Sequence, residues 1–164
     1  MPFRIEVMKS DDWPDVRAIY EEGLATGVGS FEIGTPSWEQ WNRARLPHSR
    51  LVARGDAVLG WAALSAVSQR ACYAGVAEVG IYVAAAARGR GVGRALLEAI
   101  IESAESHGIW TLQGATIAEN AASLALQARC DFRTVGRRER IAKRDGAWHD
   151  TILTERRSKK IGAD

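Results

Sequence analysis

The feature of this sequence that most constrains its fold is a cluster of alternating glycines and arginines, Arg88-Gly89-Arg90-Gly91-Val92-Gly93-Arg94. The cluster lies between an apolar run typical of a buried strand, residues 77–83, and a segment with apolar residues at helical spacing, residues 92–107. Glycine permits tight turns and a close approach of the backbone to a ligand. A helix that begins directly after such a loop presents free N–H groups and a partial positive charge to an anion. The cluster therefore predicts a strand–loop–helix unit that binds phosphate.

The cluster does not match the two commonest phosphate-binding motifs. A P-loop requires Gly-Lys-Ser/Thr, whereas Gly93 is followed here by Arg94-Ala95. The dinucleotide motif GxGxxG needs glycine where Arg94 stands, and its usual acidic residue at the end of a following strand is missing. The pattern therefore favours a pyrophosphate ligand other than NAD or ATP, with the three arginines as forked donors to phosphate. The structural alternative is a glycine-rich connection with solvated arginines.

The rest of the chain divides into alternating strands and helices. We expect strands at 4–7, 51–54, 58–66, 77–83, 111–117, 132–136 and 148–154, and helices at about 13–25, 38–45, 92–107 and 120–129. Hairpin strands first and β-α-β units later predict an α+β fold with a mixed sheet. The length of 164 residues is that of one domain. We expect that domain at 1–157 and a frayed polar tail at 158–164.

Composition and charge exclude several other classes of protein. A net charge of +2 is too small to favour nucleic acid as the main partner. No apolar run approaches the roughly 20 residues of a membrane span, and the first ten residues lack the apolar core of a signal peptide. Cys72, Cys130 and the three histidines show no metal-ligand spacing, so no metal site is predicted. We therefore expect a cytoplasmic protein without a metal cofactor.

Together with other segments, the glycine cluster resembles the acetyl-CoA loop of the GNAT superfamily of N-acetyltransferases, Arg/Gln-x-x-Gly-x-Gly/Ala. Arg88, Gly91 and Gly93 occupy its fixed positions. The segments 70–73, 119–123 and 146–150, Glu78 and the loop around Ser30-Phe31 are similar to the phosphinothricin and methionine-sulfone acetyltransferase branch. This likeness covers about residues 3–157. It implies a three-layer α/β/α arrangement with a splayed, mostly antiparallel mixed sheet of about seven strands, four helices and a homodimer.

The resemblance implies that acetyl-CoA lies where the fourth and fifth strands part. Its pantetheine arm would pair with the backbone of residues 81–83 like a short added strand. Loop amides would hold the pyrophosphate, and Asn120 would hydrogen-bond the pantetheine. The predicted cofactor-binding residues are Ile81, Tyr82, Val83, Arg88, Gly89, Arg90, Gly91, Val92, Gly93, Arg94, Asn120 and Ser123.

Glu78 is the predicted catalytic base. It is the only acid in the apolar run 74–83 that leads into the loop, and a carboxylate withdrawn from water becomes a better base. We expect a primary amine to attack directly in a ternary complex, since Cys72 has no histidine nearby in sequence and Cys130 lies by the end of a short helix. The alternatives for Glu78 are a solvated strand face and a structural ion pair. Many relatives carry tyrosine or histidine where Gln127 stands, so no general acid is predicted.

The resemblance places a small amino-acid-like amine near the loop before Glu78. The predicted substrate-binding residues are Phe31, Gln69, Arg70, Tyr73, Glu78, Val79 and Gly80. Arg70 is the predicted partner for a carboxylate, and Trp41 is a candidate for the edge of the cleft. Close relatives often read His-Ser where Val79-Gly80 stand, which predicts a smaller or more apolar acceptor than phosphinothricin. Two other functions stay open: acetylation of a protein N-terminus or lysine, and acyl-CoA binding without turnover.

Overall fold

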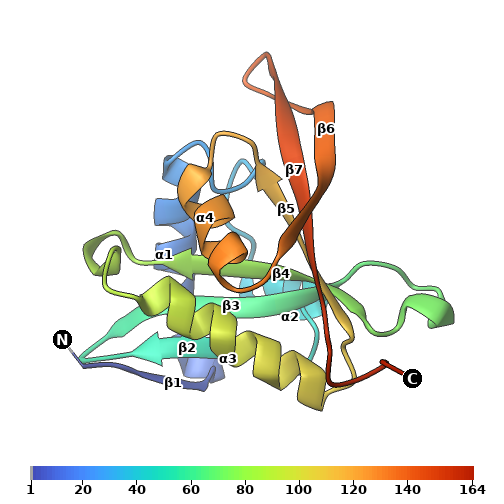
Figure 1. Cartoon of the computed structure of the whole chain (residues 1–164). Coiled ribbons are helices and arrows are strands. Elements are labelled where there is room, and N and C mark those ends of the chain that lie inside the picture. Colours follow the sequence, from blue (N-terminus) through green and yellow to red (C-terminus); the bar gives the residue numbers. More distant parts are fainter. Residues whose placement is uncertain (1) are drawn as a thin grey trace.

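The chain forms seven strands and four helices, described over residues 2–164 in a computed structural model (Figure 1). The strands are β1 (Arg4–Val7), β2 (Leu51–Arg54), β3 (Val58–Ala66), β4 (Val76–Val83), β5 (Thr111–Ile117), β6 (Arg133–Arg144) and β7 (Ala147–Arg157). The helices are α1 (Trp13–Ala25), α2 (Trp38–Ala44), α3 (Val92–Ser106) and α4 (Ala121–Arg129). Short 3-10 turns occur at Ser10–Asp12, Ala71–Tyr73 and Ala85–Ala87.

All seven strands belong to one mixed sheet in the order β1-β2-β3-β4-β5-β7-β6. Every neighbouring pair is antiparallel except β4 and β5, which are parallel. The predicted α+β fold with a mixed, mostly antiparallel sheet is therefore confirmed.

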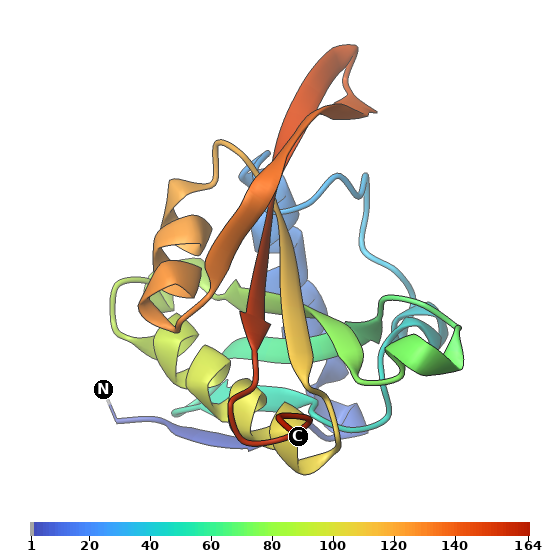
Figure 2. The same cartoon turned by 45° about the vertical axis from the view of Figure 1, so that its right-hand side comes forward.

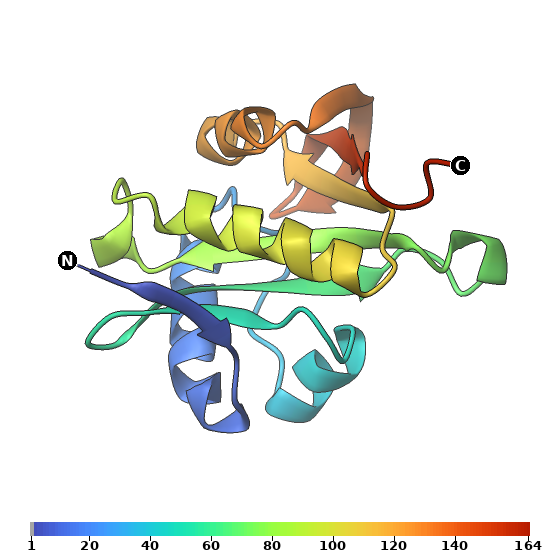
Figure 3. The same cartoon turned by 60° about the horizontal axis from the view of Figure 1, so that its bottom comes forward.

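Helices cover both faces of the sheet. Figure 3 shows α3 on one face and α1 and α2 on the other. The apolar stripe of α3, with Leu96, Leu97 and Ile100 completely buried, packs on β2, β3 and β4. On the opposite face α1 and α2 pack an aromatic cluster against the same strands, and its members include Tyr20, Trp41, Trp61 and Tyr82. Each face of the sheet therefore has its own core.

Helix α2 begins as its sequence predicts. The Ser37 hydroxyl accepts the backbone N–H of Gln40 (3.2 Å), and the Gln40 side chain accepts the backbone N–H of Ser37 (2.9 Å). This reciprocal cap satisfies two donors that a helix start leaves free. Trp41, expected at the edge of the cleft, is instead 1% exposed and packs against Trp13 and Trp61. That expectation was wrong, because α2 turns this ring into the core of its own face.

The two parallel strands separate soon after they begin. Their ladder consists of the pairs Val76–Thr111, Ala77–Leu112 and Glu78–Gln113. Beyond these pairs β4 continues beside β3 and β5 continues beside β7, as Figure 2 shows. Residues 79–83 of β4 therefore have one edge without a neighbouring strand.

The last two strands are longer than the sequence predicted. They form a twisted ribbon that extends beyond the rest of the sheet (Figure 2), with register shifts at Thr134/Gly136 and Arg138/Ala142. Most of β6 is exposed on both faces, so it carries no alternation of apolar and polar residues from which its length could be predicted.

The tail at 158–164 makes hydrogen bonds to the preceding domain. Ser158 is buried and donates its N–H to the Trp110 carbonyl (2.8 Å), while the Arg157 guanidinium donates to the Ile161 carbonyl (3.1 Å). Backbone carbonyls of the tail thus find a donor in Arg157, the last residue of β7, which the sequence does not reveal.

Two kinds of feature are missing from residues 2–164. None of their helices combines the length and the apolar character needed to cross a bilayer. Nor do three or more of their His, Cys, Asp and Glu side chains gather closely enough to hold a metal ion.

Candidate active site

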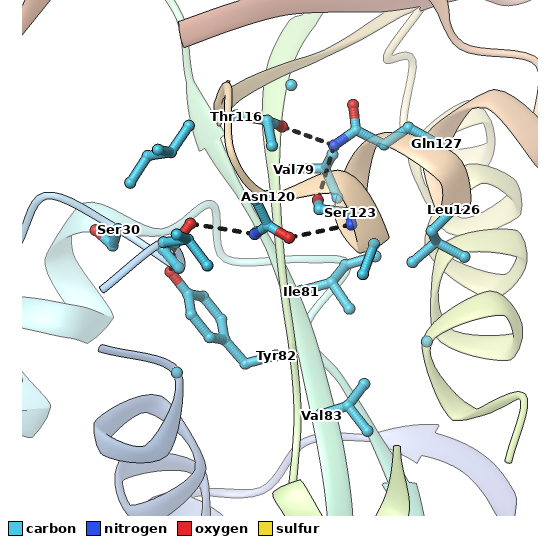
Figure 4. Close-up of a pocket in the computed structure, with 18 of the residues that line it drawn as sticks. Ser30, Val79, Ile81, Tyr82, Val83, Thr116, Asn120, Ser123, Leu126 and Gln127 are labelled. Atoms are coloured by element: carbon cyan, nitrogen blue, oxygen red, sulfur yellow. Dashed lines mark hydrogen bonds between the residues drawn. The ribbon is translucent and has the colours of Figure 1, made fainter. Parts of the chain in front are cut away.

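A cavity of about 900 Å³ occupies the space that opens between β4 and β5. It is lined by residues 78–83 of β4, 114–117 of β5, the glycine loop, helix α4 and the segment 28–32. Figure 4 shows the part of this lining that comes from β4, Thr116, α4 and Ser30. All predicted cofactor-binding residues line it except Arg90. Of the predicted substrate-binding residues, it includes Phe31, Glu78, Val79 and Gly80. One cavity therefore joins the glycine loop to Glu78.

The glycine loop presents backbone donors to one end of this cavity. Gly89 (φ 75°) and Gly91 (φ 81°) adopt the left-handed conformation that favours glycine. Gly91 precedes α3, and its carbonyl accepts the N–H of Ala95 (3.0 Å), the first bond of the helix. The N–H groups of residues 92–94 thus have no acceptor within the helix. This arrangement is suited to a phosphate group.

The three arginines of the loop are less available as donors to a phosphate group than the sequence suggests. Arg94 Nε forms an ion pair with Glu98 (2.7 Å), and Arg88 Nε donates to the Val83 carbonyl (3.4 Å). Arg90 is exposed and does not line the cavity. The backbone amides at the start of α3 are therefore the donors of the loop that an anion can reach without displacing a protein partner.

Glu78 stands where the two parallel strands part. Its Oε2 accepts a hydrogen bond from Gln113 Nε2 (2.9 Å), across the last pair of the ladder. The side chain is half-buried, and its Oε1 accepts no hydrogen bond from residues 2–164. Gln113 thus fixes one carboxylate oxygen and leaves the other free, a positioning role that the sequence did not predict.

Space opens beside Glu78 on the face of β4 that α1 and α2 cover. Alternation along the strand places Glu78, Gly80 and Tyr82 on this face. A Cβ at Gly80 would meet only the Ala63 carbonyl oxygen, at 3.9 Å. Tyr82 closes the far side of the gap, with its ring stacked on Trp61 at a centroid distance of 5.0 Å. We refer to the part of the cavity between Tyr82 and Glu78 on this face as its second compartment.

The segment at 28–30 is held over the cavity by three side chains from distant parts of the chain. The carbonyls of residues 28, 29 and 30 accept hydrogen bonds from Asn120 Nδ2 (3.1 Å), the Tyr82 hydroxyl (3.2 Å) and Arg144 Nη1 (2.8 Å). Burial raises the pKa of Tyr82, which keeps this hydroxyl protonated as a donor. Arg144 belongs to the ribbon, and no sequence pattern connects it with this segment.

Asn120 is therefore already committed at both ends of its amide. Its Oδ1 accepts the N–H of Ser123 (3.2 Å) and caps α4, while Nδ2 donates to the Val28 carbonyl (Figure 4). The predicted contact with pantetheine requires Nδ2 to exchange that carbonyl for the ligand.

Gln127, for which the sequence predicted no role as a general acid, is the centre of a buried network. Its Nε2 donates to the hydroxyls of Thr116 (2.8 Å) and Ser123 (3.1 Å), and its Oε1 accepts the hydroxyl of Thr154. All of its hydrogen-bonding groups are engaged, so this residue ties α4 to β5 and β7.

The loop between β3 and β4 lies away from the cavity. Figure 1 shows it extending beyond the end of the sheet, and Gln69, Arg70 and Tyr73 do not line the cavity. The Arg70 guanidinium lies over the ring of Tyr73 (5.3 Å), which is 45% exposed. Arg45 and Ser65, which the sequence analysis did not select, line the cavity instead.

Three comparisons relate this site to known proteins. The family model described as acetyltransferase (GNAT) family matches residues 12–132. A phosphinothricin N-acetyltransferase from Alcaligenes faecalis is 36% identical over 163 residues, covering 93% of this chain and 81% of that protein. An L-methionine sulfoximine/L-methionine sulfone acetyltransferase from Pseudomonas aeruginosa is 30% identical, with 88% of each chain covered. The crystal structure of a GNAT superfamily phosphinothricin acetyltransferase from Sinorhizobium meliloti in complex with AcCoA has a TM-score of 0.90 at 25% identity, covering 100% of this chain and 92% of that one.

Proposed function

The chain belongs to the acetyltransferase (GNAT) family, and from this membership we propose that it transfers the acetyl group of acetyl-CoA to the primary amine of a small amino-acid-like molecule. Direct attack takes place in a ternary complex, with Glu78 as the base. The observation that supports this most strongly is the continuity of one cavity from the glycine loop, past the free edge of β4, to Glu78.

The cofactor half of the cavity fits acetyl-CoA, which supplies an acetyl group activated as a thioester. Residues 79–83 offer backbone N–H and C=O groups along the free edge of β4, as an extended arm requires. The amides of residues 92–94 and the start of α3 offer donors to a pyrophosphate. Gly93 allows close packing here, since a Cβ would lie 3.2 Å from Leu126 Cδ2.

Glu78 accounts for the proton. An ammonium group has no lone pair, so the acceptor must lose a proton before it can attack. Glu78 Oε1, which is free of hydrogen bonds from residues 2–164, accepts that proton while Gln113 holds Oε2 in place. General-base assistance of this kind contributes roughly 10²- to 10⁴-fold to a rate. The leaving thiolate is protonated by solvent, because Gln127 has no acidic proton to give.

The substitution Glu78→Gln tests this assignment. It keeps the size of the side chain and removes the base, so kcat falls by about 10²- to 10⁴-fold while the Kd for acetyl-CoA is unchanged. The matched control is Glu102→Gln, which removes an exposed carboxylate from α3 without any hydrogen bond or ion pair among residues 2–164. Near-normal turnover by Glu78→Gln would remove Glu78 from the mechanism.

Release of free CoA thiol, followed with several acceptors, separates this function from the two alternatives. Free amino acids that accelerate thiol release identify a small-molecule acetyltransferase. Acceleration only by a peptide would identify a protein acetyltransferase, and the same slow hydrolysis with every acceptor would identify an acyl-CoA-binding module.

The homodimer and the cytoplasmic location stay predictions. The β6–β7 ribbon exposes Val135, Ile141 and Trp148, and burial of such apolar surface favours association. We therefore place the expected contact between two copies on this ribbon.

A further inference from the structure

Arg45 is a cation in the acceptor half of the cavity that the reaction proposed above does not use. It follows directly after α2 and lines the cavity together with Ser65 and Glu78. Its Nη1 donates to Ser65 Oγ at 2.7 Å. No carboxylate of residues 2–164 lies within the 4.0 Å of an ion pair with it. A partly buried guanidinium without a counter-ion indicates that an anion binds there.

The surroundings hold this guanidinium in one place. Its Cζ lies 5.8 Å from the ring centroids of both Trp41 and Trp61, which are almost completely buried. Such contacts between a cation and aromatic rings are attractive. Arg50 holds the backbone of Arg45 in place, because its Nη2 donates to the Arg45 carbonyl (3.0 Å). Arg45 Nη2 makes no hydrogen bond within residues 2–164, so the group is positioned and still has donors to offer.

Strand register places Ser65, the hydrogen-bond partner of Arg45, beside the proposed base Glu78. Ser65 on β3 lies directly opposite Glu78 on β4, and such antiparallel partners have Cβ atoms about 5 Å apart on the same face. In an α-amino acid the amine nitrogen and the carboxylate carbon are separated by two bonds, about 2.5 Å. An acceptor with its amine at Glu78 therefore has its carboxylate within reach of the Arg45 side chain, and its own side chain faces the open space at Gly80.

We propose that Arg45 binds the carboxylate of the acceptor and so makes this enzyme selective for free α-amino acids. The inference rests on the proposed function and deepens it. It also replaces Arg70 in the role that the sequence suggested, since Arg70 lies outside the cavity over the exposed ring of Tyr73.

The test compares each acceptor acid with its uncharged carboxamide. L-Methionine and L-methionine sulfone, and the amide of each, are assayed with the wild type and with Arg45→Gln, Arg45→Lys and Arg70→Gln. We expect Arg45→Gln to lower kcat/KM for the acids by about 10- to 100-fold, as the loss of charged hydrogen bonds implies, and to leave the amides within about twofold. Arg45→Lys, which keeps the charge but not the fork, gives a smaller loss. Because variants are compared on the same acceptor, differences in amine basicity between acid and amide cancel.

The controls separate binding of the carboxylate from a structural role. Arg43→Gln removes an exposed arginine from α2, two residues before Arg45, and leaves the kcat/KM of all four acceptors unchanged. Equal losses on acid and amide with Arg45→Gln would assign Arg45 to packing alone. A selective loss of the acids with Arg70→Gln, and not with Arg45→Gln, would also overturn the proposal.

Failure of the proposed function has a different signature. In that case the wild type acetylates none of the four acceptors. Calorimetric titration of the CoA-saturated protein with L-methionine sulfone and its amide then decides on Arg45 independently. Binding of the acid that Arg45→Gln abolishes supports the carboxylate site, and absence of any binding of the acid refutes it.

Discussion

The substitution Gly80→Ala is expected to change the stability of the fold and the activity on large acceptors in opposite directions. Its backbone is not among the positive-φ glycines, so alanine fits the local conformation. The added methyl would meet only the Ala63 carbonyl oxygen, at 3.9 Å, an ordinary van der Waals distance. Replacing glycine by alanine at a compatible site restricts the unfolded chain and raises the free energy of unfolding by about 0.4–1 kcal/mol. We therefore expect Gly80→Ala to be slightly more stable than the wild type.

The same methyl points into the compartment between Glu78 and Tyr82, where we place the acceptor. One carbon too many in a fitted pocket costs about 1–3 kcal/mol, or roughly 10- to 200-fold in kcat/KM. This loss falls mainly on acceptors with long side chains, such as methionine sulfone, and least on glycine. The Kd for acetyl-CoA stays constant, because the glycine loop and the free edge of β4 are not changed.

Thermal unfolding and the thiol-release assay measure the two effects on one preparation. Gly60→Ala is the contrasting variant, since a Cβ there would lie 2.9 Å from the Tyr82 carbonyl oxygen and 3.0 Å from Leu96 Cδ1. It lowers the free energy of unfolding through overpacking. If Gly80→Ala acetylates long and short acceptors at unchanged rates, the acceptor does not occupy the space beside this residue, and the assignment of the compartment is wrong.

Two further predictions concern buried polar groups. Gln127→Leu leaves the Thr116 and Thr154 hydroxyls buried without their Gln127 partner. We expect urea denaturation to show that the free energy of unfolding falls by about 2–4 kcal/mol. An unchanged denaturation midpoint would contradict this. Burial, and then the charges of His107 and Arg50, lower the pKa of His48 below the ordinary 6.5. As the pH falls, the imidazole is therefore protonated in the unfolded chain before it is protonated in the native chain. The free energy of unfolding thus decreases as the pH drops below about 6.5 toward the lower native pKa. Thermal melts of wild type and His48→Asn between pH 5.5 and 8 should differ in slope, and parallel curves would exclude this contribution.

The elements that the sequence predicted well are those whose apolar residues repeat at a clear period. This patterning predicts the hairpin of β2 and β3 and the buried helix α3. The N-cap residue Ser37 predicts the start of α2. The β6–β7 ribbon lacks such a pattern, because most of β6 faces solvent on both sides and two register shifts interrupt its pairing. Its length depends on hydrogen bonds to the neighbouring strand, which a single segment does not encode.

The same division applies to the site. The glycine loop and Glu78 lie within seventeen consecutive residues, 78–94, so their spacing along the chain was enough to select them. Arg45 belongs to a segment with several other arginines, and nothing in that segment distinguishes it from Arg43 or Arg50. Its place in the cavity results from the register that sets Ser65 opposite Glu78, and from two tryptophans on different elements. Only the tertiary structure brings these contributions together.

The geometry of strand β4 explains why the sequence selected the residues that line the cofactor half of the cavity but missed Arg45 and Ser65 in its acceptor half. Its successive side chains alternate, with Val79, Ile81 and Val83 packed toward α3 and Tyr82 packed toward α1. The open edge of the strand faces the proposed cofactor arm through backbone groups, which most substitutions in β4 would preserve. The acceptor, as proposed, instead meets Arg45 after α2, Ser65 of β3 and the segment 28–32. To that face β4 contributes Glu78, the gap at Gly80 and the ring of Tyr82. Changes on those other elements can therefore alter the acceptor without disturbing the cofactor site.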